Sequence, residues 1–138
     1  MPKFIVIFLI ALGLCVNSST FAATAPDAAK EAADVWLALA DKGDAQATWD
    51  QAASAFKSGI EQKEWESTLS KARQPLGEVT SRTLLSSEAT TTLPGVADGE
   101  FVIFRYQTSF ASKRRVSEAL LMQKEADGMW RTVGYFLQ

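Results

Sequence analysis

Hydrophobic positions follow three successive patterns along the 138-residue chain. Near the start, thirteen apolar residues follow one another without interruption, from Phe4 to Val16. From about residue 28 to residue 72 the apolar residues recur every three or four positions, and after Gly77 they alternate with polar residues. A continuous run, then helical spacing, then strand spacing predicts an export leader followed by helices and a sheet.

The leader is predicted at residues 1–22. Lys3 gives a positive start, the apolar run is shorter than the roughly 20 residues of a membrane helix, and Thr20 and Ala22 suit a cut before Ala23. We therefore expect a periplasmic or secreted protein with a single domain at residues 23–138 and no membrane anchor after cleavage. Two alternatives stay open: an uncleaved anchor, and a lipoprotein signal at Cys15, which the large Leu14 before it disfavours.

The first helix is expected to start near Pro26 and to end at Lys42. Proline and an acidic residue suit a first turn, Thr24 is a candidate cap, and Gly43 suits the left-handed position that follows a helix. The apolar residues that recur at helical spacing, and that we expect on the buried face, are Ala28, Ala32, Val35, Trp36 and Leu39.

Two more helices are expected before Gly77. Asp44 is the predicted cap of the second helix, and Ser58 with Glu61 has the spacing of a capping box for the third. The third helix should end near Arg73, because Pro75 disfavours helical backbone in the residue before it. The predicted buried residues of the two helices are Trp49, Ala52, Ala53, Phe56, Trp65, Leu69 and Ala72.

Four strands are expected in the second half, at residues 79–92, 101–111, 114–125 and 130–137. The connections between them are short and rich in turn residues, Asp127-Gly128 among them, which favours an antiparallel meander. The predicted fold is therefore α+β, with three N-terminal helices packed on a four-stranded antiparallel sheet.

The second strand carries apolar residues on both faces. Phe101 and Ile103 point one way, and Val102, Phe104 and Tyr106 point the other. A sheet with one solvated face would alternate more cleanly. If the helices cover one face, the other face meets a second subunit, a ligand or the curl of the sheet itself. We expect a homodimer or a ligand-lined concavity.

Composition excludes several kinds of chemistry. The chain has no histidine, and its one cysteine, Cys15, lies in the predicted leader, so a histidine base, a thiol nucleophile and the usual zinc ligands are missing. Without Lys3 the domain has 13 basic and 16 acidic residues, a net charge of −3, which disfavours nucleic-acid binding. We expect no metal and no cofactor.

Several segments together resemble one family of small secreted bacterial proteins, the domain of unknown function 4019. The resemblance runs from about Glu31 to Gln138. It depends on the order and spacing of the segments more than on any single motif. It implies no activity, because the family has none assigned. The segments are Trp36 to Leu39, Gly43-Asp44 with Ala47 to Trp49, Arg73 to Gly77 with Ser81-Arg82, Leu93 to Gly95, Asp98 to Glu100, and Asp127 to Tyr135.

The order of helices and strands also resembles the cone of nuclear transport factor 2 and ketosteroid isomerase. That resemblance implies a buried carboxylate base with tyrosine donors in an apolar pocket. The carboxylates on predicted strands are Glu88, Glu100 and Glu118, and the tyrosines are Tyr106 and Tyr135. At each glutamate a solvated or salt-bridged side chain is the favoured interpretation, so we name no catalytic residue.

Two arginines lie inside predicted strands. Arg82 and Arg105 each need a planar acidic partner, and a structural ion pair is favoured over an anion site in a ligand pocket. The weak candidates for binding are therefore Arg82, Arg105, Tyr106 and Tyr135. We interpret the four tryptophans as mostly core, and the basic run Lys113 to Arg115 as a solvated hairpin tip.

The leading functional hypothesis is an exported, non-enzymatic domain that binds a protein or a small apolar ligand, or associates with itself through its second sheet face. The alternative is a small-molecule-binding or isomerase-like enzyme with an apolar pocket between helices and sheet. A carboxylate and a tyrosine in a closed cavity would favour that alternative.

Overall fold

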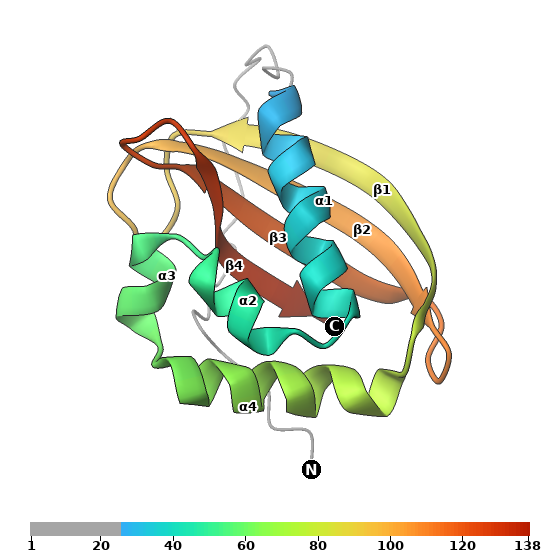
Figure 1. Cartoon of the computed structure of the whole chain (residues 1–138). Coiled ribbons are helices and arrows are strands. Elements are labelled where there is room, and N and C mark those ends of the chain that lie inside the picture. The colour runs from blue at the N-terminus through green and yellow to red at the C-terminus, as the bar shows by residue number, and fades with distance from the viewer. Residues whose placement is uncertain (1–25) are drawn as a thin grey trace.

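The computed structural model describes residues 26–138 and confirms the α+β prediction, with the helices preceding a four-stranded antiparallel meander (Figure 1). The predicted leader at 1–22 and the candidate cap Thr24 lie outside the described residues. The helices gather on one face of the curved sheet (Figure 1). Within residues 26–138, no helix has the length and apolar character needed to cross a membrane.

Helix α1 spans Asp27–Asp41 and ends as predicted, with Lys42 as the C-cap and Gly43 at φ 76°. Its predicted buried face is wrong by one position. Only Trp36 of the predicted set is buried, and Val35 is 53% exposed. The helix turns its small residues inward, where the backbone can approach the sheet closely; the buried set is Ala29, Ala33, Trp36, Leu37 and Ala40.

The predicted second helix is two short helices, α2 (Ala45–Asp50) and α3 (Ser54–Gly59), so the helix count of three is wrong. Asp44 caps α2 as expected, because its side chain accepts a bond from the Ala47 amide at 3.0 Å. The break has a tertiary cause. The Ala53 amide donates to the Thr132 carbonyl at 2.8 Å, so the chain leaves the helical path at this residue. Sequence spacing alone does not reveal this pairing.

Helix α4 spans Gln62–Arg73 and continues into a 3-10 turn, η1 (Gln74–Leu76). The predicted capping box is wrong: Glu61 is the N-cap without a side-chain bond, and the Ser58 hydroxyl donates to the Ser54 carbonyl. The predicted end is confirmed. Gly77 then takes φ 75°, which a residue with a side chain rarely adopts.

The strands are β1 (Val79–Thr90), β2 (Glu100–Phe110), β3 (Val116–Lys124) and β4 (Trp130–Leu137), in the order β1-β2-β3-β4. Strands β1 and β4 are therefore the sheet edges. In β1 the register shifts between Leu84 and Ser86, and in β3–β4 it shifts where Leu121 pairs with Gly134 and Met122 with Thr132. These bulges bend the sheet around the helices.

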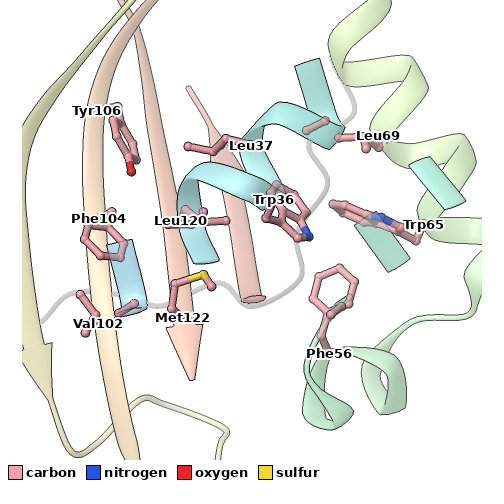
Figure 2. Packing of buried hydrophobic residues seen from close by; sticks show 14 of the residues in the cluster. Trp36, Leu37, Phe56, Trp65, Leu69, Val102, Phe104, Tyr106, Leu120 and Met122 are labelled. Atoms are coloured by element: carbon pink, nitrogen blue, oxygen red, sulfur yellow. The ribbon is translucent and has the colours of Figure 1, made fainter. Parts of the chain in front are cut away.

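The core lies between the helices and the helix-facing side of the sheet (Figure 2). Phe56 and Trp65 meet edge to face with ring centroids 4.8 Å apart, and Trp36 lies beside Trp65 at 6.3 Å. Both indole N–H groups bond to Thr48, which is fully buried. Trp36 and Trp65 are core residues as predicted, whereas Trp49 and Trp130 are half-buried against the core.

The other sheet face is mixed in character. Phe101 is 1% exposed, and its ring lies 3.6 Å from the Cβ position of Gly99, in the connection between β1 and β2. Arg105 and Gln107 are exposed on this face, and Ile103 and Leu121 are half-buried. Part of the apolar character predicted for this face is thus covered by the chain itself.

Candidate functional site

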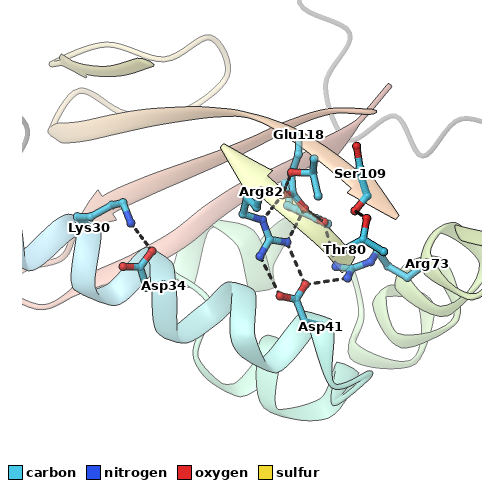
Figure 3. Close-up of polar contacts among 10 residues, drawn as sticks. Lys30, Asp34, Asp41, Arg73, Thr80, Arg82, Ser109 and Glu118 are labelled. Atoms are coloured by element: carbon cyan, nitrogen blue, oxygen red, sulfur yellow. Dashed lines mark hydrogen bonds and ion pairs between the residues drawn. The ribbon is translucent and has the colours of Figure 1, made fainter. Parts of the chain in front are cut away.

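A cluster of charged side chains lies on the helix-facing side of the sheet (Figure 3). We call Asp41, Arg73, Arg82, Glu118 and Tyr135 the charge cluster. Asp41 ends α1 and Arg73 ends α4, while Arg82, Glu118 and Tyr135 come from β1, β3 and β4. Two carboxylates meet two guanidinium groups, so the charges balance.

Glu118 is the most buried member, with a side-chain exposure of 0%. Its Oε1 accepts bonds from Arg82 Nε at 2.6 Å and from the Thr108 hydroxyl at 2.9 Å. Its Oε2 accepts from Arg82 Nη2 at 3.2 Å and from the Tyr135 hydroxyl at 2.5 Å. Both oxygens of the buried carboxylate therefore have two donors each, as a charge in the interior requires.

Asp41 joins the two arginines. Arg82 binds it through two nitrogens at 2.8 and 2.9 Å, and Arg73 Nη2 donates to it at 2.8 Å. Burial alone would raise the pKa of Asp41, but the hydrogen bonds from Arg82 and Arg73 outweigh burial and hold the pKa below its usual value. Asp41 therefore ties the ends of two helices to the sheet.

Burial raises the pKa of both tyrosines. For Tyr135 the pKa lies well above 10, because desolvation and the nearby Glu118 carboxylate both disfavour the phenolate. For Tyr106 desolvation raises the pKa to about 12. The Tyr106 hydroxyl is buried without a partner among the described residues, and Arg82 lies 6.0 Å from the Tyr106 ring centroid.

A pocket of about 220 Å³ lies between α3, β4 and the connection from β1 to β2. We call it the β4-edge pocket. Its walls come from α3, from Trp65 of α4, from Leu121 of β3, from the connection between β1 and β2, and from β4. None of its lining residues is charged; they are Ala55, Phe56, Ser58, Gly59, Trp65, Leu93, Pro94, Gly95, Val96, Leu121, Val133, Gly134, Tyr135 and Phe136.

Tyr135 is shared by the two places. The residue is part of the lining of the β4-edge pocket. Its ring packs on Trp36 with centroids 4.9 Å apart, and its hydroxyl donates to Glu118 and accepts from Arg73 Nη1 at 3.2 Å. Glu118 does not line the pocket. The two places thus share Tyr135, and the buried carboxylate is not part of the pocket wall.

Sequence reasoning named four candidate residues, and the structure does not bring all of them together. Arg82 and Tyr135 meet at Glu118, and Tyr106 lies against Arg82. Arg105 lies on the opposite sheet face with a side chain 45% exposed, where it pairs with Glu88 at 3.2 Å. Both arginines have acidic partners, in agreement with the structural ion pairs that the sequence analysis favoured.

The remaining candidates are solvated. The side chains of Glu88 and Glu100 are 61% and 67% exposed, and the hairpin tip Lys113 to Arg115 is exposed. Within residues 26–138, no group of three acidic, histidine or cysteine side chains is placed to hold a metal ion.

Some residues of the site were missed from the sequence. Asp41 was not singled out from the sequence, and Arg73 was named only as the end of a helix. The tertiary structure shows that Asp41 binds Arg82 of β1 and that Arg73 binds Tyr135 of β4. The segment Leu93 to Val96 was interpreted as part of a turn-rich connection, although a turn-rich apolar segment before a core strand is a signal that could have suggested a pocket wall.

Comparison with known proteins adds a family. Residues 32–135 match the model of a protein family of unknown function, DUF4019. No curated protein matches the chain. The matched range covers most of the residues that form the helices, the sheet, the charge cluster and the β4-edge pocket. The chain belongs to the DUF4019 family of proteins of unknown function.

Proposed function

We propose that this protein is an exported, non-enzymatic binding domain that takes up an uncharged apolar group in the β4-edge pocket. The observation that carries the proposal is the lining of this pocket: four aromatic side chains, aliphatic residues and no charge. An apolar cavity of about 150 Å³ is already enough to bind benzene. A pocket of about 220 Å³ has room for a ring or a short branched chain.

The polar groups of the charge cluster bond to one another, which supports binding rather than catalysis as the function. An isomerase-like mechanism needs a carboxylate that faces the substrate. Glu118 instead faces Arg82, Thr108 and Tyr135, with two donors on each oxygen. The charge cluster is better explained as a structural tie between the helices and the sheet.

A fluorescence titration with the neutral dye Nile red, which is larger than the pocket and can insert its diethylamino group or one ring, tests the proposal. A Cβ built at Gly59 meets nothing within 4 Å, so Gly59→Leu has room for its side chain beside the pocket. Gly59→Leu and Ala55→Leu, singly and together, should weaken dye binding at least about tenfold. Gln46→Leu, on an exposed position of α2, is the matched control and should bind like wild type. Equal binding by all variants would refute the proposal.

Self-association through the outer sheet face stays a prediction. Ile103 and Leu121 are half-buried there, but Arg105 and Gln107 beside them are exposed, so the face offers a modest apolar surface. The mass of the purified protein from light scattering decides between monomer and dimer.

A further inference from the structure

The β4-edge pocket has an unusual wall. Four consecutive residues of β4, Val133 to Phe136, line it. Successive side chains of a strand point to opposite faces, so a pocket on one face would be lined by every second residue. Four in a row line the same pocket, which places it along the edge of β4, where every second residue of the strand directs its N–H and carbonyl groups.

The hydrogen-bond pattern shows which backbone groups point to this edge. Ser117 and Gln138 exchange both of their N–H to carbonyl bonds at 2.9 Å, which makes them a hydrogen-bonded pair of the β3–β4 ladder. Such pairs alternate along an antiparallel ladder. With Glu118 opposite Leu137 and Leu120 opposite Tyr135, the N–H and carbonyl groups of Leu137 and Tyr135 point away from β3.

These groups have no partner among the residues that the structure describes. The loop and turn bonds of residues 26–138 include none to the backbone of Tyr135 or Leu137, and no side chain bonds to them. The same edge is already used further upstream, where Ala52 pairs with Thr132 in parallel and the Ala53 amide donates to its carbonyl. After Ala53 the chain turns into α3 and leaves the edge.

We propose that the ligand is an extended polypeptide segment that adds to the edge of β4 at Tyr135 and Leu137 and inserts one apolar side chain into the β4-edge pocket. The inference deepens the proposed function and rests on it. A polypeptide backbone is the ligand chemistry that supplies donors and acceptors at the spacing of a strand edge. The absence of charge from the pocket lining selects a side chain that is itself uncharged.

The strand edge and the pocket contribute differently to peptide recognition. Backbone bonds at Tyr135 and Leu137 are indifferent to peptide sequence, so they supply affinity. The aromatic walls formed by Phe56, Trp65 and Phe136 supply the selection, because a polar or charged side chain would lose its hydration there without a compensating bond. A bound peptide therefore needs one apolar residue, and its neighbours are free to vary.

The experiment selects peptides from a phage-displayed library of random linear heptapeptides on the purified protein. We expect enriched sequences that share one apolar position, and no such enrichment on the Gly59→Leu, Ala55→Leu double variant. A synthetic enriched peptide should slow the exchange of the Tyr135 and Leu137 amides with solvent at least about tenfold in NMR spectra. Two versions of this peptide carry N-methyl groups on the odd or on the even residues, and one of the two should lose binding, because only alternate N–H groups of the peptide donate to β4.

Other outcomes separate the two proposals. Two outcomes overturn the strand addition and leave the apolar pocket standing: dye binding without peptide enrichment, and unchanged binding by both N-methylated versions of the peptide. Slow exchange of the Tyr135 and Leu137 amides that depends on protein concentration, with no peptide added, means that a second copy occupies the edge, which also overturns the proposed occupant. If the wild-type protein binds neither the dye nor any peptide, both proposals are overturned.

Discussion

Arg82 of β1 reaches Glu118 of β3 across the width of β2, and its Nε lies 2.6 Å from the carboxylate. The pair spans three strands on the side of the sheet that the helices cover (Figure 3). Arg82 also binds Asp41 at the end of α1 with two nitrogens. The guanidinium of Arg82 therefore connects α1 to β1 and β3, the two strands that flank β2.

Replacing Arg82 should be strongly destabilising. Arg82→Met leaves the Glu118 carboxylate buried without its cation, and removal of one partner of a buried pair costs about 3–5 kcal/mol. Urea denaturation measures the free energy of unfolding. Arg105→Met is the matched control, since its side chain is 45% exposed, and it should change stability by less than about 1 kcal/mol.

The double variant Arg82→Met, Glu118→Leu distinguishes a paired charge from two independent contacts. Replacement of both partners by apolar groups removes the unpaired charge, so the double variant should be less destabilised than the sum of its single variants. Additive effects would show that the two side chains stabilise the fold separately.

Stability should fall at acid pH because of Asp41. Its pKa in the folded protein is held below the ordinary value of about 3.9. A depressed pKa stabilises the folded state above the unfolded value, and this contribution is lost as the pH falls through the folded pKa. Asp41→Asn should therefore be less stable than wild type at neutral pH, with the gap narrowing below about pH 4. A gap that does not depend on pH would contradict this role.

Neither tyrosine should ionise in the pH range of a free phenol. The chain has two tyrosines, and burial raises the pKa of Tyr106 to about 12 and that of Tyr135 well above 10. A raised folded pKa favours the folded state below the unfolded value of about 10, and this contribution is lost as the pH rises above it. Near-ultraviolet absorbance should show no tyrosinate until the protein unfolds. Half-ionisation of one tyrosine near pH 10 would place its hydroxyl in solvent.

Two glycines beside the pocket should differ in their tolerance of alanine. A Cβ at Gly134 meets Phe136 Cε2 at 3.2 Å and Leu121 Cδ2 at 3.4 Å, so Gly134→Ala should cost about 1–3 kcal/mol through overpacking. Gly59→Ala has open space and ordinary backbone, and it should be neutral or stabilise α3 by up to about 1 kcal/mol. Thermal unfolding of the two variants checks this, and equal melting temperatures would refute the crowding at Gly134.

The sequence predicted the fold class, the strand order and the ends of α1 and α4, because alternation, Gly43 and the Pro75-Gly77 turn act locally. It did not predict the break between α2 and α3 or the buried face of α1. The break depends on Thr132, which is distant in sequence, and the close approach of α1 selects small residues where periodicity favoured Val35. Tertiary packing overrides local pattern at both places.

The candidate site was only partly predictable for the same reason. An arginine inside a strand signals an acidic partner, and Arg82 has one as expected, yet the sequence does not say that Asp41 and Glu118 both supply it. The β4-edge pocket joins α3 to residues about 35 and 75 positions later in the chain. No local sequence pattern predicts that these distant segments lie together.

Chemical-shift mapping with Nile red tests the central claim most directly, because it locates the bound group on the protein. The account predicts that the largest amide shifts fall on the lining of the β4-edge pocket, with Gly59, Val96 and Gly134 among them. Shifts that centre on Arg82 and Glu118, or on the exposed Val35 and Met129, would contradict it and place the binding site elsewhere.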